Sequence, residues 1–208
     1  MAQIIAGLDV GTSTVTTIVG KKGKDDSLEV MGVSVVPSEG IRKGVVIDVE
    51  DATRAIRHSI LEAGRAAQIP IKSAVISLSG SYIHTSSSRG VIAVSRADGE
   101  ISEEDVRRAF TAAETFIPKN LNRDTLHIIP KEFKVDNEVG IRDPIGMNGV
   151  RLEVDTLVLE AQIHSLKTLY KCVETAGLRR EGTVFAPIAA ADAVLTKKQK
   201  ELGVILVD

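Results

Sequence analysis

The residues best suited to chemistry lie close together near the N-terminus. The apolar run Ile4–Leu8 ends in a carboxylate, Asp9. Glycine permits tight turns that expose backbone N–H groups, and a turn rich in N–H and hydroxyl donors can bind phosphate. Carboxylate oxygen is a preferred ligand of Mg²⁺, directly or through water. A turn of this kind follows Asp9, and the candidate phosphate ligands are Gly11, Thr12, Ser13 and Thr14.

The segment after this turn restricts the kind of nucleotide site. The β-branched run Val15–Val19 favours a strand. A dinucleotide fingerprint or a Walker A loop would open into a helix, and neither sequence pattern is present. The phosphate would therefore lie on a β-hairpin. From the spacing alone, an ordinary hairpin with an acidic residue at the end of its first strand is an equally good interpretation.

Composition limits the class of protein and of partner. A chain of 208 residues with 43% hydrophobic and 26% charged residues is typical of a soluble globular protein with one or two domains. The net charge of −2 gives no general attraction to nucleic acid or anionic lipid. The single cysteine, Cys172, fits a reducing compartment. No signal peptide or run of about 18 apolar residues is evident, so we expect a cytoplasmic protein. From the net charge, we expect that it binds no nucleic acid.

The predicted elements of the first part indicate a mixed sheet with a helix on one face. Two strands enclose the Asp9 turn, and further β-rich runs follow. Apolar residues then recur at helical spacing, with Asp48 or Glu50 as a cap. The expected ranges are strands at Leu28–Val36, Val45–Ile47 and Ala74–Leu78, a loop at Pro37–Gly44 and a helix at Asp51–Gln68.

A smaller module follows, with the order strand-helix-strand-strand. The serine-rich stretch Ser77–Ser88 suits a linker, a domain crossing or a hairpin tip. Ser102 and Asp105 form a capping-box pattern before an amphipathic helix. The apolar residues of the loop Asn137–Gly149 could either pack or mark a contact surface. The expected strands are Arg89–Ser95, Leu126–Val135 and Val150–Gln162.

The last segment returns to alternating strands and helices. Ser165 is expected to cap a helix that ends at Gly177. The final apolar run repeats the opening pattern of a strand that ends in an acid, Asp208, so we expect the chain to stop where a second phosphate loop would begin. The other expected elements are a strand at Gly182–Ala186, a helix at Pro187–Leu195, a polar turn at Lys197–Glu201 and a strand at Gly203–Val207.

In these patterns, the sequence resembles the FtsA family of bacterial actin-like cell-division proteins over essentially all 208 residues. The phosphate motif alone would indicate only the wider actin, chaperone and sugar-kinase superfamily. Two features distinguish FtsA from the rest of this superfamily: the stretch Gly140–Glu153 and the position of the inserted module. The matching stretches are GLDVGTSTVTTIVG (Gly7–Gly20), SLSGSYIHT (Ser77–Thr85), HIIPKEF (His127–Phe133), GIRDPIGMNGVRLE (Gly140–Glu153) and ELGVILVD (Glu201–Asp208).

The resemblance implies a two-lobed actin fold that binds ATP between its lobes. This sequence would supply one α/β lobe, ribonuclease-H-like in its strand order, from residues 1–84 and 165–208. A small α+β insertion domain would span residues 85–164, with the second lobe and a membrane helix absent. Asp9 would orient Mg²⁺ through water, the Gly11–Thr14 turn would contact the β- and γ-phosphates, and Asp208 would open the second phosphate loop as a further cofactor and metal residue.

The resemblance also implies a function in assembly rather than in catalysis. The segment Val184–Ile188 offers no polar residue to position water, so no catalytic residue is expected and ATP would serve as a structural ligand, bound weakly by one lobe. FtsA-like proteins self-assemble, anchor FtsZ at the inner membrane of the division septum and recruit later division proteins. The insertion domain would carry self-contact and recruitment, and the absent half would carry the contacts to FtsZ and membrane.

Two other classes of protein stay open at this point. One is an actin-superfamily enzyme, such as a kinase or a chaperone-type ATPase, which would need a substrate pocket or a catalytic acid near the phosphate. The other is a ribonuclease-H-like nuclease, in which Asp9 and Asp208 would hold two metal ions. That interpretation needs further carboxylates on neighbouring strand ends and a basic surface, and the net charge argues mildly against it.

Overall fold

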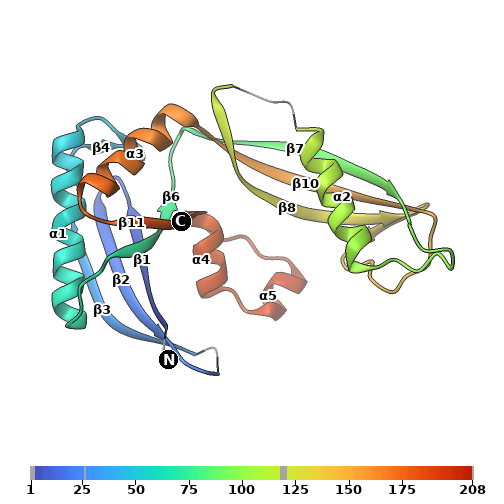
Figure 1. The fold of residues 1–208 in the computed structure, drawn as a ribbon, viewed down its shortest axis with the longest axis horizontal. Coiled ribbons are helices and arrows are strands. Elements are labelled where there is room, and N and C mark those ends of the chain that lie inside the picture. The colour runs from blue at the N-terminus through green and yellow to red at the C-terminus, as the bar shows by residue number, and fades with distance from the viewer. Residues whose placement is uncertain (1–2, 26, 118–120, 208) are drawn as a thin grey trace. The chain divides into compact units, whose positions relative to one another are not determined.

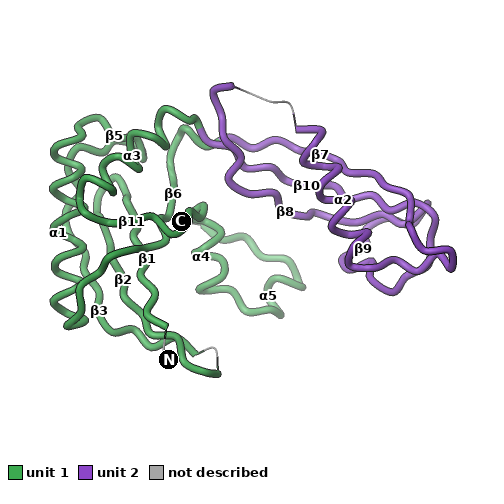
Figure 2. The backbone as a smooth tube through the Cα atoms, in the orientation of Figure 1, with its two compact units in different colours: residues 1–83, 162–208 green, residues 84–161 purple. Residues whose placement is uncertain are grey.

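The chain forms two compact units. The computed structural model describes residues 3–25, 27–117 and 121–207. Unit 1 consists of Met1–Ile83 and Gln162–Asp208, and unit 2 of His84–Ala161, coloured green and purple in Figure 2. The domain boundaries expected from the sequence lie one residue later at the first crossing and three residues later at the second.

Unit 1 is built on a five-stranded mixed sheet with the order β11-β6-β1-β2-β3. The pairs β1/β2 and β2/β3 are antiparallel, whereas β6 runs parallel to both β1 and β11. This arrangement brings the carboxyl ends of β1, β6 and β11 to the same edge of the sheet. The strand bounds are β1 Gln3–Val10, β2 Thr14–Lys22, β3 Leu28–Pro37, β6 Ser73–Leu78 and β11 Arg179–Phe185.

One face of this sheet is covered by α1 (Val49–Ala67), which packs on β2 and β3 (Figure 1). The Asp48 side chain accepts a hydrogen bond from the Asp51 N–H and so caps the helix N-terminus. Val19 packs with small residues of the helix in a buried cluster. Because side chains alternate along a strand, the buried residues of β1 and β2 face α1, and their neighbours face the other side. The buried set is Ala6, Leu8, Val10, Val15, Thr17 and Val19.

Two further helices of unit 1, α3 and α4, pack against β11. The helix α3 packs against α1 and β11, and α4 packs against β11 and β6. A two-stranded hairpin lies between β3 and α1 in the chain. The bounds of these elements are α3 Ile163–Thr175, α4 Ala186–Val194, α5 Lys197–Leu202, β4 Ile41–Arg42 and β5 Val45–Val46.

Unit 2 is a four-stranded sheet, ordered β7-β10-β8-β9, with α2 on one face. Its core contains Ala109 and Ala113 of the helix. Phe110 and Phe133 meet edge to face, with ring centroids 6.0 Å apart. The Ser102–Asp105 capping box predicted from the sequence is present at the start of α2. The bounds are β7 Ile83–Ala93, α2 Glu103–Thr115, β8 Arg123–Val135, β9 Glu138–Ile141 and β10 Arg151–Gln162.

Four segments expected to be irregular contain strand or helix residues. The crossing between the two units lies in the serine-rich stretch, but the second half of the stretch belongs to β7, where the Ser88 hydroxyl donates to the Ala113 carbonyl oxygen at 2.6 Å. The expected loop Asn137–Gly149 contains β9, and of its apolar residues Ile141 and Met147 pack on the core. The expected loop and polar turn at Pro37–Gly44 and Lys197–Glu201 contain β4 and α5.

Two expectations for the last segment are wrong. Ser165 does not cap α3, because the helix already begins at Ile163 and its N-cap residue is Gln162. Gly203–Val207 is not a strand, since it pairs with neither β11 nor β3, the two edges of the sheet, and Ile205 is 88% exposed. Asp208 lies outside the described residues, so its predicted roles at the phosphate and metal remain predictions.

Candidate functional site

The candidate site begins with Asp9, near the carboxyl end of β1. Strand pairing places Asp9 level with Ser77 on β6 and with Thr16 on β2. Both neighbours carry hydroxyl groups, and no further carboxylate lies at this level of the sheet. The complete row across the five strands is Val184, Ser77, Asp9, Thr16 and Val35.

The two carboxylate oxygens of Asp9 have different surroundings. Oδ1 accepts a short hydrogen bond from the Ser77 hydroxyl. Oδ2 lies toward the turn, 3.5 Å from where a Cβ atom on Gly11 would be, and accepts no hydrogen bond from the described part of the chain. The carboxylate is therefore anchored on the β6 side and directed toward the predicted phosphate ligands on the other side.

The turn after Asp9 is tight and tied to neighbouring loops. The Gly11 N–H donates to the Thr14 carbonyl oxygen at 3.0 Å, and a Cβ on Gly11 would lie only 2.9 Å from that oxygen. The Thr12 hydroxyl oxygen accepts from the Gly44 N–H at 3.0 Å, and the Ser13 carbonyl oxygen accepts from the Ser38 N–H at 3.0 Å. The side chains from Thr12 to Thr14 are exposed and reachable by a ligand.

A cavity of about 370 Å³ adjoins Asp9 on the face of the sheet opposite α1. Its polar lining comes from Asp9, Thr16 and Ser77. This volume is in the range of small-molecule sites. The apolar lining includes Ile18 and Val75 of the sheet together with Val184, Ala186, Ala189 and Ala190.

These residues fit a magnesium nucleotide in type and placement. The turn requires glycine at position 11, because a Cβ there would lie 2.9 Å from the Thr14 carbonyl oxygen. Asp9 supplies a carboxylate oxygen beside that turn, which suits a hard cation. No group of three or more histidine, cysteine or acidic residues within 3–25, 27–117 and 121–207 could hold a metal by itself.

Ser77 is the site residue that the sequence interpretation missed. The sequence places it both in the predicted strand Ala74–Leu78 and at the start of the serine-rich stretch, and neither interpretation linked it to Asp9, which it contacts. The available signal was the parallel pairing of strands, whose carboxyl ends meet at one edge of a sheet. A polar residue near the end of Ala74–Leu78 could have been matched with Asp9 on that basis.

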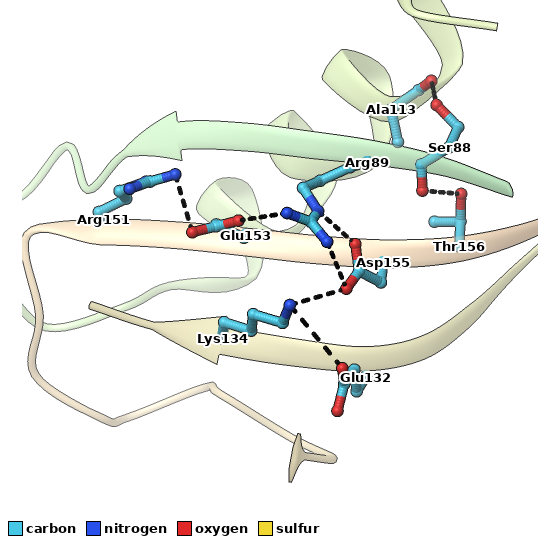
Figure 3. A network of polar contacts seen from close by, with 9 residues as sticks. All are labelled: Ser88, Arg89, Ala113, Glu132, Lys134, Arg151, Glu153, Asp155 and Thr156. Atoms are coloured by element: carbon cyan, nitrogen blue, oxygen red, sulfur yellow. Dashed lines mark hydrogen bonds and ion pairs between the residues drawn. The ribbon is translucent and has the colours of Figure 1, made fainter. Parts of the chain in front are cut away.

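Unit 2 contains a separate polar network on the sheet face away from α2 (Figure 3). Arg89 binds Asp155 through two hydrogen bonds, and Lys134 lies 3.0 Å from the same carboxylate. The hydrogen bonds from Arg89, followed by that from Lys134, lower the pKa of Asp155. Glu153, only 6% exposed, lies 2.9 Å from Arg151 and 3.8 Å from Arg89. Charges of both signs thus alternate across this face.

Within the described ranges, no helix is both long and apolar enough to cross a membrane.

Comparison of the three-dimensional structure identifies the class of fold. A solved structure titled "PilM-PilN type IV pilus biogenesis complex" matches with a TM-score of 0.62 and 16% identity, covering 90% of this chain and 49% of that chain. Residues 80–160 match the model of the SHS2 domain inserted in FtsA. The chain is therefore an actin-like α/β lobe with an SHS2 insertion, which confirms the predicted fold class.

Sequence comparison shows a similarity to cell division proteins. The chain is 37% identical over 207 residues to the cell division protein FtsA of Pseudomonas aeruginosa, covering 99% of this chain and 49% of the relative. It is 39% identical over 207 residues to FtsA of Bacillus subtilis, covering 99% and 46%. The chain is thus similar to FtsA proteins over nearly its whole length, and it spans about half the length of these relatives.

Proposed function

We propose that this chain is the part of an FtsA-type division scaffold that binds the phosphates of ATP and contacts other proteins. The observation that carries the proposal is the Asp9 carboxylate beside the Gly11–Thr14 turn, in a chain similar to cell division proteins over 99% of its length. ATP, Mg²⁺ and the partners named below are parts of this proposal.

In this account the chain binds and orients the nucleotide. Bound Mg²⁺ would neutralise phosphate charge and fix the position of the phosphates. Asp9 would hold the water shell of the cation. The hydroxyls of the Gly11–Thr14 turn, with those of its backbone N–H groups that are not bonded within the turn, would donate to the β- and γ-phosphate oxygens. Asp208 would act at the second phosphate loop. One lobe contacts only one side of the ligand, so its affinity alone is weak.

The nucleotide serves here as a structural ligand with slow hydrolysis at best. Near Asp9, the α4 side of the cavity is lined by Val184, Ala186, Ala189 and Ala190. None of these side chains can accept a proton from water or orient it by a hydrogen bond. A kinase or fast ATPase would need such a group at this position.

Unit 2 supplies the protein contacts in this proposal. Its sheet face away from α2 carries the Arg89–Asp155 network, whose alternating charges suit a polar protein interface more than an apolar one. Self-contact and recruitment of later division proteins are assigned to this unit. Contacts with FtsZ and with the cytoplasmic face of the membrane at the septum are assigned to the other half of the full-length protein.

The proposal is tested by sedimentation of a hybrid in which this chain replaces the matching half of the Bacillus subtilis relative. We expect more of the hybrid to sediment with Mg-ATP than without it, and this gain to be lost in Asp9→Ala. Asp25→Ala, a change of an exposed acid in the β2–β3 turn, should behave as the parent. Rapid phosphate release without assembly would contradict the scaffold and favour an enzyme.

A further inference from the structure

We propose that Ser77 is a positioning residue that fixes the carboxylate of Asp9 in the orientation needed to hold the magnesium ion of the nucleotide. The proposal rests on the proposed nucleotide site and adds to it a residue outside the turn that follows Asp9. Its basis is the hydrogen bond from the Ser77 hydroxyl to Asp9 Oδ1, together with the rigid placement of both residues in the sheet.

Ser77 is held on both sides by backbone pairing. It lies level with Asp9 on β1 and with Val184 on β11, so β6 is an inner strand at this point. Its neighbours along the strand, Ile76 and Leu78, are almost fully buried and anchor β6 against the core. The backbone positions of Ser77 and Asp9 are therefore fixed relative to each other.

The hydrogen bond gives the two carboxylate oxygens of Asp9 different roles. The terminal torsion of an aspartate is broad, so an unrestrained carboxylate samples many orientations. Donation by Ser77 fixes Oδ1, and Oδ2 then lies on the side of Gly11. A cation between the turn and β1 would therefore meet an oxygen that is already directed toward it. Partners of this kind, which orient a metal-binding carboxylate, typically change metal affinity by about tenfold or more when they are removed.

Two other hydroxyl groups show that this role is specific to Ser77. Thr16 is level with Asp9 on the other neighbouring strand, but no hydrogen bond joins these two described residues. Ser73 lies on the same strand as Ser77, and its hydroxyl donates to the Glu181 carboxylate at 2.6 Å, away from the turn. Ser73→Ala is therefore a matched control, because it removes the same kind of bond from the same strand.

The test measures how strongly Mg²⁺ strengthens nucleotide binding to the 208-residue chain. The probe is a non-hydrolysable ATP analogue, and binding is followed by the amide NMR signals of Gly11–Thr14, with EDTA and with Mg²⁺. The ratio of the two dissociation constants is the magnesium effect. A merely structural role for Ser77 would change both constants alike and leave this ratio unchanged.

We expect Ser77→Ala to reduce the magnesium effect about tenfold while affinity in EDTA stays near that of the parent. Ser77→Thr, which keeps a hydroxyl, should restore the effect, and Ser73→Ala should match the parent. If Ser77→Ala does not fold, Ser77→Cys provides the same test, because a thiol keeps the size of the side chain and is a weak donor.

The outcomes separate this inference from the proposed function. A parental magnesium effect in Ser77→Ala, together with its loss in Asp9→Ala, would overturn the role of Ser77 and leave the nucleotide site intact. Loss of the effect in Ser77→Thr as well would also overturn it, because the hydroxyl would then not be the cause. A parent chain whose nucleotide binding is indifferent to Mg²⁺ would overturn both proposals.

Discussion

The hydroxyl groups of Thr17 on β2 and Ser59 on α1 lie 2.7 Å apart, and both residues are completely buried. This is a buried polar contact in the layer between the sheet and α1. It joins the strand that follows the candidate phosphate turn to the helix that supports that strand. The same Ser59 hydroxyl lies 3.3 Å from the Val15 carbonyl oxygen.

Removing both partners of this pair should cost less stability than the sum of the two single removals. Ser59→Ala leaves the Thr17 hydroxyl buried without its partner, and we expect a loss of about 1–2 kcal/mol in the free energy of unfolding. In the double variant Thr17→Val, Ser59→Ala, the unpaired hydroxyl is gone, and the loss should be smaller than the sum of the single losses. Urea unfolding measures all four proteins. Strictly additive losses would contradict the coupling.

The second prediction concerns the contact of α2 with β7. A Cβ on Gly90 would lie 1.9 Å from the Ala109 carbonyl oxygen and 2.7 Å from the Ala113 backbone nitrogen. Gly90→Ala must push the helix away from the sheet, and overpacking of this kind costs about 1–3 kcal/mol. Gly182→Ala is the control, since nothing lies within 4 Å of its Cβ position. Equal unfolding midpoints for the two variants would show that α2 is not seated this closely.

The third prediction concerns Asp105, which is fully buried at the start of α2. Its carboxylate accepts hydrogen bonds from the N–H and hydroxyl groups of both Ser95 and Ser102, at 2.6–3.1 Å, and lies 3.1 Å from Arg108. Asp105→Ala removes the shared acceptor, and we expect unit 2 to lose about 3 kcal/mol. Glu104→Ala, an exposed acid one residue earlier, should change stability by less than about 1 kcal/mol. Similar losses of stability for Asp105→Ala and Glu104→Ala in thermal unfolding would contradict this role of Asp105.

Asp105 should also make unit 2 sensitive to acid. The hydrogen bond from the Ser102 hydroxyl is the largest cause that lowers the pKa of Asp105 below its usual range. A carboxylate with a lower pKa in the folded state stabilises the fold above the unfolded pKa of about 3.9 and loses this effect as the pH falls. The stability difference between the parent and Asp105→Asn should therefore shrink below about pH 4. Parallel stability curves down to about pH 3 would contradict the assignment.

Local patterns predicted much of the fold. The mixed sheet, α1 and the Ser102–Asp105 capping box follow from β-branched runs, helical periodicity and cap residues that act within a few positions of each other. Only the second part of β7, from Arg89, was predicted. Its first part was missed because serine is a turn former by local preference, and the stability of that part comes from distant groups such as the Ala113 carbonyl oxygen. Tertiary context decided its structure.

In the candidate site too, the sequence predicted the residues that are close together in the chain and missed the distant one. Asp9 and the Gly11–Thr14 turn are contiguous, so their types and spacing were sufficient to single them out. Ser77 is 68 residues from Asp9 in sequence, and only the parallel register of β1 and β6 brings the two side chains together. Similarly, the segment Gly203–Val207 has the composition of a strand but no neighbouring strand to pair with. Local preference alone therefore gave the wrong prediction.

The most direct test of the central claim is paramagnetic broadening of the amide NMR signals by Mn²⁺ bound to a non-hydrolysable ATP analogue. Mn²⁺ replaces Mg²⁺ and broadens signals of nearby residues. The account predicts that broadening centres on Asp9, the Gly11–Thr14 turn and Ser77, and that Asp9→Ala abolishes it. Broadening centred on unit 2, or unchanged broadening in Asp9→Ala, would contradict the claim that Asp9 and its turn form the nucleotide site.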